Sequence, residues 1–401
     1  MRRTTRASAR TRARSTLADV ADIRFSIDSS GGAPVLVVAV DGDRQPVPAL
    51  WLREQSRDPS QLDLVSDQRL FDPHRLPDEL AIVDVAIEPS ADGDLVHARF
   101  SDGHDETFDA TDLAVAIDPD DGCPDPAAWT SALATPPRHD WRDLDHPAAL
   151  EAALHDFLRY GTIVVHDTPT TEGTVLEVAE RFGHVRTTNF GRLFDVRSIP
   201  NPNDLAYTPV PLGPHTDNPY RTPTPGIQLL HCLVNDTSGG HSTLVDAIAV
   251  TDRLRDEDPA GLDLLIDTIV RFHFRDDSTA FDSWGPIVDV DHRRRVIGLH
   301  YSPKLDHIPL MSLERTRAYH RARRRLAELL RDPEFEIRFV LQPGEVMIFS
   351  NDRVLHGRTG FDPAEGPRLL QGCYIDHDEP RSRYRVLRRN LSHSFALLGD
   401  D

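Results

Sequence analysis

The stretch Pro214-His-Thr-Asp-Asn-Pro-Tyr220 is the most informative in this chain, because it places His215 and Asp217 two positions apart. On an extended strand, residues i and i+2 point to the same face, so both side chains can reach one metal ion. A further histidine, His356, follows roughly 140 residues later, between a strand pattern and a glycine. Two imidazoles and one carboxylate leave three positions of an Fe(II) ion open for a chelating co-substrate and O2. We therefore predict that His215, Asp217 and His356 are the metal ligands and the catalytic centre.

Arg368 stands twelve positions after His356, in Pro367-Arg-Leu-Leu-Gln-Gly-Cys-Tyr374. A single arginine is usually a surface ion-pair partner, but the apolar neighbours of Arg368 predict a buried strand, where a charge requires an anionic partner. A guanidinium can fork onto a carboxylate, so Arg368 is predicted to bind the far carboxylate of 2-oxoglutarate. A His-x-Asp pair also arises by chance in a chain with 19 histidines, and many histidines are only structural. The combination of the triad with Arg368 favours the metal interpretation.

The pattern of short apolar segments predicts a mainly β fold with helices, of the α+β class. Strand patterns separated by turn residues occur in 161–166, 227–234, 242–246, 336–341, 346–349 and 369–375, and helical patterns in 147–158, 174–182 and 313–330. Many short strands with a few helices indicate a sandwich or jelly roll with helical cover.

The chain is long enough for one large domain and one smaller domain, because single cores rarely exceed roughly 300 residues. Strand patterns at 33–40, 80–87 and 95–100 predict a small β-rich domain before a segment dense in Asp, Pro and Gly. We predict four parts: a disordered Arg-rich tail at 1–16, a small N-terminal accessory domain at 17–117, a linker at 118–139 and a catalytic domain at 140–401.

The overall charge limits the classes of partner. A formal net charge of −20 disfavours nucleic acid and anionic membranes, because phosphate binding requires a basic surface. No apolar run approaches the roughly 20 residues that span a bilayer. Three scattered cysteines, Cys123, Cys232 and Cys373, do not make a disulfide framework, and reduced thiols predict a cytoplasmic protein.

The chain resembles the gamma-butyrobetaine hydroxylase family, a branch of the taurine-dioxygenase-like oxygenases. The resemblance covers most of residues 140–391 and is carried, in family order, by Phe190-Gly191, Asp204-Leu-Ala-Tyr207, His215-Thr-Asp-Asn-Pro-Tyr220, Gly226-Ile-Gln-Leu-Leu-His-Cys232, Gly239-Gly-His-Ser-Thr-Leu-Val-Asp246, Leu355-His-Gly-Arg358, Leu370-Gln-Gly-Cys-Tyr-Ile-Asp376 and Ser382-Arg-Tyr-Arg-Val-Leu387. The N-terminal Ala49-Leu-Trp-Leu-Arg53 is similar to the start of the family's accessory domain.

The resemblance implies a double-stranded β-helix (jelly roll) and a homodimer. It also implies Fe(II) as cofactor, with 2-oxoglutarate and O2 as co-substrates, and Arg368 as the 2-oxoglutarate anchor with Ser242 as a helper. The reaction begins with abstraction of a hydrogen atom from a small substrate. Hydroxylation, desaturation and rearrangement all begin in this way and stay open.

Family members bind a trimethylammonium group in a cage of aromatic rings, and the matching positions here are Phe190, Phe194, Tyr207 and Tyr374. Aromatic faces attract a quaternary cation with roughly 0.5–2 kcal/mol per good contact. Four aromatic residues at such spacings are otherwise more often part of a core. Phe190 and Phe194 stand where the family more often has Tyr and Trp, so the resemblance implies a reshaped pocket.

Two departures from the family change the expectations. The accessory domain lacks the family's three zinc-binding cysteines, and His104 alone cannot hold structural zinc, so we predict no zinc. Asp204 stands where the family has an Asn that grips the substrate carboxylate, and a carboxylate there would repel an anion. Lys304 or a nearby Arg is the hypothetical replacement. The resemblance therefore implies that the substrate is a trimethylammonium carboxylate like gamma-butyrobetaine or, as in relatives of the family, a phosphonate like 2-trimethylaminoethylphosphonate.

Three other interpretations stay open from the sequence. One is an oxygenase of the same family that acts on an unrelated small metabolite in a natural-product pathway. Another is a zinc hydrolase that uses the same two histidines and aspartate, which would require a general base beside the bound water and leaves Arg368 unexplained. The last is a binding protein on a decayed oxygenase fold, against which the intact triad and arginine argue.

Overall fold

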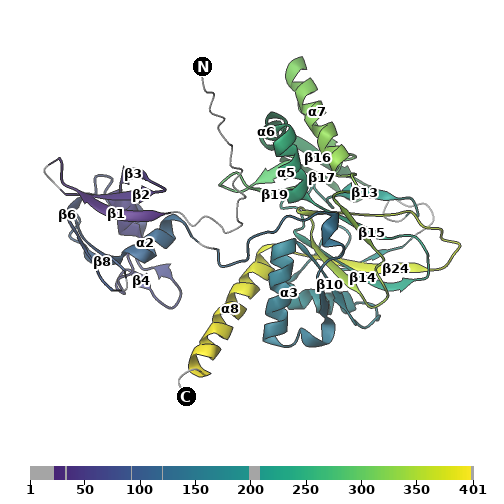
Figure 1. Ribbon diagram of the computed structural model, residues 1–401, viewed down its shortest axis with the longest axis horizontal. Helices are drawn as coiled ribbons and strands as arrows, with labels where there is room; N and C mark the ends of the chain where they lie inside the picture. The colour runs from purple at the N-terminus through teal and green to yellow at the C-terminus, as the bar shows by residue number, and fades with distance from the viewer. Residues whose placement is uncertain (1–21, 32–33, 92, 120, 198–207, 399–401) are drawn as a thin grey trace, which may run out of the picture. The chain divides into compact units, whose positions relative to one another are not determined.

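A computed structural model describes residues 22–31, 34–91, 93–119, 121–197 and 208–398 of the chain. The chain divides into two compact units, Met1–Asp121 and Gly122–Asp401 (Figure 1). The tail expected at residues 1–16 lies outside the described residues. Within them, no helix combines the length and the apolar character that crossing a bilayer requires.

Unit 1 contains two three-stranded antiparallel sheets and two main helices. One sheet has the order β1–β2–β3 (Ile23–Asp28, Val35–Val40, Asp43–Pro46) and the other β6–β7–β8 (Ile82–Glu88, Leu95–Phe100, Asp105–Asp109). The helices are α1 (Ala49–Glu54) and α2 (Ala110–Ile117), and a short hairpin joins β4 (Leu62–Asp63) to β5 (Gln68–Arg69). The predicted strands correspond to β2, β6 and β7. They share a hydrophobic core with both helices, which includes Leu36, Leu52, Val96, Phe100 and Leu113.

The carboxylate of Glu106 on β8 joins several segments of unit 1. One of its oxygens accepts hydrogen bonds from the backbone N–H groups of Arg57 and Asp58 at 2.8 and 3.0 Å. The other accepts from the Ser56 hydroxyl at 2.5 Å and lies 2.7 Å from Nε2 of His104. His104, the expected remnant of a zinc site, is therefore engaged with a carboxylate. Hydrogen bonds to a buried charge hold the loop after α1 against β8.

Unit 2 is a jelly roll of two facing sheets. The larger sheet has the order β11–β24–β14–β22–β10–β9, and β12 also pairs with β24. Its strands are β11 (Val185–Arg186), β24 (Arg368–Ile375), β14 (Ile227–Asn235), β22 (Val346–Ser350), β10 (Thr162–His166), β9 (Arg138–Asp140) and β12 (Phe194–Val196). The smaller sheet has the order β13–β23–β15–β21, with strands Leu212–His215, Val354–Arg358, Ser242–Asp246 and Glu336–Phe339. A core of residues from both sheets, including Leu230, Leu244, Met347, Phe349 and Leu370, packs between the two layers. The predicted jelly roll is confirmed.

Helices cover the outside of the larger sheet. The cover consists of α3 (Pro147–Tyr160), α4 (Thr174–Phe182) and α8 (Asp378–Leu398). Figure 1 labels α3 and α8. Phe157 of α3 and Phe182 of α4 pack with Ile227 and Leu229, which stand on the face of β14 that points away from the inter-sheet core. The alternation along β14 explains this arrangement, because successive side chains of a strand point to opposite faces. The sequence predicted α3 and α4 but not α8.

A second layer of helices and small sheets continues from the smaller sheet. It comprises α5 (Ala247–Glu257), α6 (Pro259–Asp267) and α7 (Leu313–Leu329), with strands β16 (Val270–Arg275), β17 (Ala280–Gly285), β18 (Val288–Val290), β19 (Val296–Leu299) and β20 (Asp306–His307). These elements share one hydrophobic core that includes Leu254, Leu265, Phe272, Tyr319 and Leu326. Of this layer, only α7 was predicted from the sequence.

The segment predicted as a linker, 118–139, differs from the structure over most of its length. Residues from Gly122 onward belong to unit 2. The backbone N–H of Trp129 donates to Asp246 at 3.0 Å, and its indole N–H donates to the carbonyl of Tyr160 at 2.8 Å. Arg138 begins β9, which pairs in parallel with β10. The segment was predicted as a linker because it is rich in Asp and Pro and has no strand pattern. In the structure, the buried Trp129 anchors it to unit 2.

Candidate active site

The predicted metal ligands converge at one end of the smaller sheet. His215 ends β13 and lies directly opposite His356 of β23 in the antiparallel register, and their ring centroids are 4.3 Å apart. Asp217 lies just beyond the end of β13 rather than on the extended strand that the sequence suggested. Its two oxygens nevertheless lie 3.2 Å from Nε2 of His215 and 3.8 Å from Nε2 of His356. All three ligand atoms fall within 4.8 Å of one another.

These side chains fit a divalent cation. Adjacent ligands of an octahedral ion with bonds of about 2.1 Å stand roughly 3 Å apart, close to the observed spacing. Nδ1 of His215 lies 3.0 Å from the carbonyl oxygen of Gly213, which can only accept, so Nδ1 carries the proton and Nε2 offers its lone pair. Burial lowers the pKa of His356 to about 3, and neighbouring His215 adds to the effect. His356 is therefore neutral at pH 7, as metal binding requires.

Asp217 is held by two residues from the larger sheet and its loops. The Asn351 side chain accepts from the backbone N–H of Asp217 at 2.8 Å and donates to its carbonyl at 2.9 Å. The Tyr374 hydroxyl donates to Oδ2 of Asp217 at 2.9 Å. Burial would raise the pKa of Asp217, but the nearby histidines and these hydrogen bonds outweigh burial and lower it. The sequence analysis missed Asn351, although it stands in the segment that contains His356.

Two buried guanidinium groups lie beyond the triad. Arg368 at the start of β24 and Arg358 at the end of β23 both flank the ring of Phe361, at 5.4 and 5.0 Å from its centroid. Arg368 donates one hydrogen bond of 3.3 Å to the carbonyl of Gly240, its Nε has no partner, and it makes no ion pair within the described residues. Burial lowers the pKa of Arg368, and it lowers that of Arg358 to about 10. Two buried guanidinium groups side by side require a bound anion to balance their charge, and the sequence predicted an anionic partner for Arg368.

The backbone near Arg368 leaves room for its side chain. Gly240 has a φ of +67°, and a Cβ atom there would lie 2.8 Å from Nε of Arg368. Glycine is therefore required at this position both for its conformation and for the close approach. Ser242, the predicted helper, is buried on β15 opposite Arg358 and lines the same cavity.

An aromatic wall extends from the triad. Its ring centroids are separated by 5.2 Å between Tyr374 and Phe194, 6.5 Å between Phe194 and Phe190, and 6.5 Å between Phe190 and Phe274. Phe274 stacks on Tyr220 at 4.6 Å. The sequence analysis missed Phe274 and Tyr220. The alternation in Val270-Arg-Phe-His-Phe-Arg275 is the signal that could have placed Phe274 on one face of a strand.

The triad, both arginines and the aromatic wall line one cavity of about 540 Å3, a size typical of small-ligand sites. The predicted site residues present in its lining are His215, Asp217, His356, Arg368, Ser242, Phe190, Phe194 and Tyr374. Asp204 and Tyr207, the two remaining predicted substrate residues, lie outside the described residues. The structure therefore brings together every predicted site residue that it describes.

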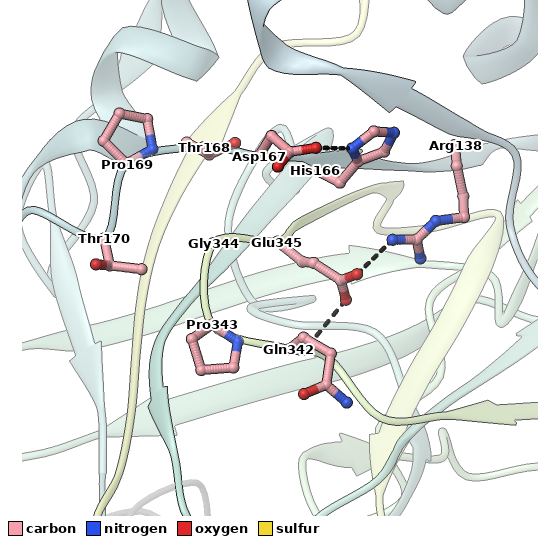
Figure 2. Close-up of a pocket in the computed structure, with 10 residues that line it drawn as sticks. All are labelled: Arg138, His166, Asp167, Thr168, Pro169, Thr170, Gln342, Pro343, Gly344 and Glu345. Carbon is pink, nitrogen blue, oxygen red and sulfur yellow. Dashed lines mark hydrogen bonds and ion pairs between the residues drawn. The ribbon is translucent and has the colours of Figure 1, made fainter.

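A second hollow of about 640 Å3 lies at the ends of β10 and β22, away from these residues. Figure 2 shows that its charged side chains contact one another: Glu345 pairs with Arg138 and accepts from the backbone N–H of Gln342 at 2.9 Å, and His166 lies 2.6 Å from Asp167. Because these groups are already matched, the hollow does not compete with the cavity at the triad as the candidate site.

Comparison with known proteins gives consistent matches. The model of the taurine catabolism dioxygenase TauD, TfdA family matches residues 130–374. Gamma-butyrobetaine dioxygenase of Pseudomonas sp. (strain AK-1) is 34% identical over 368 residues, which cover 90% of this chain and 95% of that protein. Dioxygenase str8 of Strobilurus tenacellus is 30% identical, with 86% of each chain covered. Mitochondrial trimethyllysine dioxygenase of Mus musculus is 29% identical, with 84% of this chain and 82% of that protein covered.

Proposed function

We propose that this chain, which belongs to the TauD/TfdA dioxygenase family and is an Fe(II)- and 2-oxoglutarate-dependent dioxygenase, oxidises a small trimethylammonium compound. The observation that carries the proposal is one cavity lined by a two-histidine, one-carboxylate triad, a buried arginine and a wall of aromatic rings. The names of two relatives, gamma-butyrobetaine dioxygenase and trimethyllysine dioxygenase, support this substrate class.

His215, Asp217 and His356 would hold the iron. The two imidazoles and the ionised carboxylate are already positioned, and Asn351 and Tyr374 fix the orientation of Asp217. When bound with its co-substrates, the metal supplies the oxidising power for removal of a hydrogen atom from the substrate. The side chains themselves orient the reactants, and the buried His356 and Tyr374 keep water from the inner side of the site.

Arg368 would anchor the 2-oxoglutarate carboxylate that is remote from the metal. Its guanidinium is buried on β24 and lacks a carboxylate partner within the described residues, so an anionic co-substrate would complete its hydrogen bonding. Ser242 lies across the cavity lining on β15 and can donate its hydroxyl to the same group. Arg358 beside it adds a second positive charge to this end of the cavity.

The aromatic wall would bind the cationic end of the substrate. Phe190, Phe194 and Tyr374 present ring surfaces in the cavity, and Phe274 extends the wall. A quaternary ammonium group cannot donate hydrogen bonds, so ring faces are its best protein partners. Tyr374 has a second role, because its hydroxyl is directed to Asp217 while its ring stays in the wall.

The test is succinate formation from 2-oxoglutarate with Fe(II), ascorbate and O2. We expect turnover to rise when trimethylammonium carboxylates or phosphonates are added. The matched control replaces the quaternary nitrogen by carbon, which keeps the shape and removes the charge. Equal stimulation by the neutral analogue would contradict the cation assignment, and normal turnover by a His215→Ala protein would contradict the metal assignment.

The final outcome of the reaction, hydroxylation or desaturation with rearrangement, is open in this proposal and would be read from the product by mass spectrometry. A homodimer and a cytoplasmic location stay predictions. Light scattering of the purified protein would test the first, because a dimer doubles the 44.9 kDa mass of the chain.

A further inference from the structure

The turn between β22 and β23 consists of Asn351, Asp352 and Arg353, and its three side chains bind three different parts of unit 2. The amide of Asn351 holds both backbone groups of Asp217, the metal-ligand candidate. The buried Arg353 lies 3.3 Å from the carboxylate of Asp246 at the end of β15. The turn is therefore a point where the metal site is joined to the rest of the domain.

The carboxylate of Asp352 points to a third partner, His377. Its Oδ2 lies 2.9 Å from Nε2 of His377, which stands between the end of β24 and the start of α8. Its Oδ1 accepts hydrogen bonds of 2.9 Å from the Ser350 hydroxyl and from the backbone N–H of Arg353. One carboxylate thus closes the turn and also ties it to the end of the larger sheet.

The backbone of Asp352 gives the turn a second connection to the metal site. The carbonyl of Asp352 accepts from the N–H of Leu299 at 2.8 Å, and the carbonyl of Leu299 accepts from the Thr216 hydroxyl at 2.6 Å. Thr216 is buried and directly precedes Asp217. Two hydrogen-bonded routes, through the side chain of Asn351 and through Leu299, therefore lead from the turn to the segment that carries the metal ligands.

Close packing holds the inner side of His377 in place. A Cβ atom at Gly226 would lie 2.7 Å from Cδ2 of His377 and 2.9 Å from its backbone nitrogen, so the absence of a side chain at Gly226 allows this approach. The carbonyl of Gly226 accepts from the N–H of Asn351 at 2.9 Å. His377 therefore packs on a residue that also holds the turn, while 43% of its side chain stays exposed on the outer side.

We propose that His377 is a positioning residue for the metal site, because its contact with Asp352 holds the turn from which Asn351 orients Asp217. This inference rests on the metal assignment of the proposed function. His377 and Asp352 are both outside the lining that the structure describes for the cavity, so His377 acts through the turn and not on a reactant. Residues that orient a metal ligand from outside the coordination sphere contribute to metal affinity.

The charges around the pair predict a specific pH dependence. Desolvation and Arg381 lower the pKa of His377, but Asp352 and Asp376 raise it more, to a value above 6.5. Burial raises the pKa of Asp352, but His377 outweighs burial and, with the weaker help of His300, lowers it to about 2. The pair is therefore charged below the raised pKa of His377 and loses its attraction as pH rises through that pKa. The contribution of His377 to metal affinity should disappear over the same range.

The test is titration of the metal-free full chain with Mn(II), in which the EPR signal of the free ion measures binding without catalysis. At about pH 6, His377→Gln should bind Mn(II) about three- to fivefold more weakly than the wild type, as for a partly exposed charge pair. At about pH 8.5 the two proteins should bind equally, because both side chains are then neutral. His377→Arg keeps a cation at every pH, so it should match the wild type at about pH 6 and bind more tightly than the wild type at about pH 8.5.

The matched control is His97→Gln in unit 1. Its side chain is 39% exposed and lies 3.2 Å from the carboxylate of Glu88, so it resembles His377 in exposure and pairing but not in position. It should leave the Mn(II) affinity unchanged at both pH values. An equal loss in His97→Gln and His377→Gln would overturn the inference.

The remaining outcomes separate this inference from the metal assignment. If His215→Ala abolishes Mn(II) binding but both His377 variants bind as the wild type does at each pH, the positioning role is overturned and the metal assignment stands. A loss in His377→Gln that is the same at both pH values would indicate a merely structural role and would overturn the inference as well. If His215→Ala binds Mn(II) as the wild type does, the metal assignment fails, and the role of His377 fails with it.

Discussion

Tyr374 combines two roles that one substitution can separate. Its ring belongs to the aromatic wall, 5.2 Å from the ring of Phe194, and its hydroxyl donates to Oδ2 of Asp217 at 2.9 Å. Tyr374→Phe keeps the ring and removes the hydrogen bond. A hydrogen bond to a charged group contributes about 1.5–3 kcal/mol, and loss of a group that orients a metal ligand typically lowers metal affinity 10- to 100-fold. Asp217 accepts this hydrogen bond in the metal-free protein as well. Only part of the energy of the hydrogen bond therefore contributes to the metal affinity. We expect about tenfold weaker metal binding, at the low end of the range.

The assay is competitive titration of the protein with a divalent metal and a chelating dye, which does not depend on catalysis. The same Tyr374→Phe protein, loaded at saturating metal, should bind a trimethylammonium ligand within about twofold of the wild type, because the ring face is retained. Phe194→Leu is the reciprocal control and should weaken the ligand while leaving the metal affinity unchanged. Unchanged metal affinity in Tyr374→Phe would refute the argument that the hydroxyl orients Asp217.

Three other predictions concern separate parts of the chain. Arg368→Gln should raise the 2-oxoglutarate concentration needed for half-maximal succinate formation about 100-fold, because it leaves a carboxylate without its buried partner; an unchanged requirement would exclude Arg368 as the anchor. Glu106→Gln should lower the free energy of unfolding of unit 1 by about 2–3 kcal/mol in urea titrations, against about 0.5 or less for the exposed Glu88→Gln, and EDTA should not destabilise this unit. Partial desolvation favours neutral His377, whose side chain is still 43% exposed, but the carboxylate of Asp352 at 2.9 Å outweighs this effect and raises the pKa of His377 above 6.5. Their pairing therefore stabilises the fold at low pH and is lost as pH rises through the raised pKa. The melting temperature of wild type should exceed that of His377→Gln at about pH 6 but not at about pH 9, and a constant difference would contradict the pairing.

The sequence predicted the parts of the fold that have a strong periodic pattern. The predicted strands at 227–234, 242–246 and 346–349 and the predicted helix at 174–182 correspond to β14, β15, β22 and α4. These segments are buried on one or both faces, so their apolar spacing is clear. The 259–267 helix, α6, was missed because it is short and follows α5 after a single residue. The long α8 was missed because its first turn carries a proline and its surface is strongly basic.

The site could be predicted from the sequence where the residue types and their order indicate one kind of ligand. A His-x-Asp pair with a distant histidine and a following arginine specifies a metal and an anion, and the structure brings these side chains to one cavity. Phe274 and Tyr220 could not be found in the same way, because aromatic residues serve cores as often as cages. Asn351 acts through two backbone groups of Asp217, and such contacts leave no spacing rule in the sequence.

The two layers of the jelly roll contribute different halves of the reaction centre. His215 and His356 belong to the smaller sheet, whereas Arg368 and Tyr374 belong to β24 of the larger one. A co-substrate that contacts residues of both sheets would hold the two layers together, and how well it binds depends on the distance between the layers. Phe349 acts as a spacer between them, with its ring 4.7 Å from that of His356. Replacement of Phe349 by a smaller residue would therefore lower the activity without altering any atom that contacts a reactant.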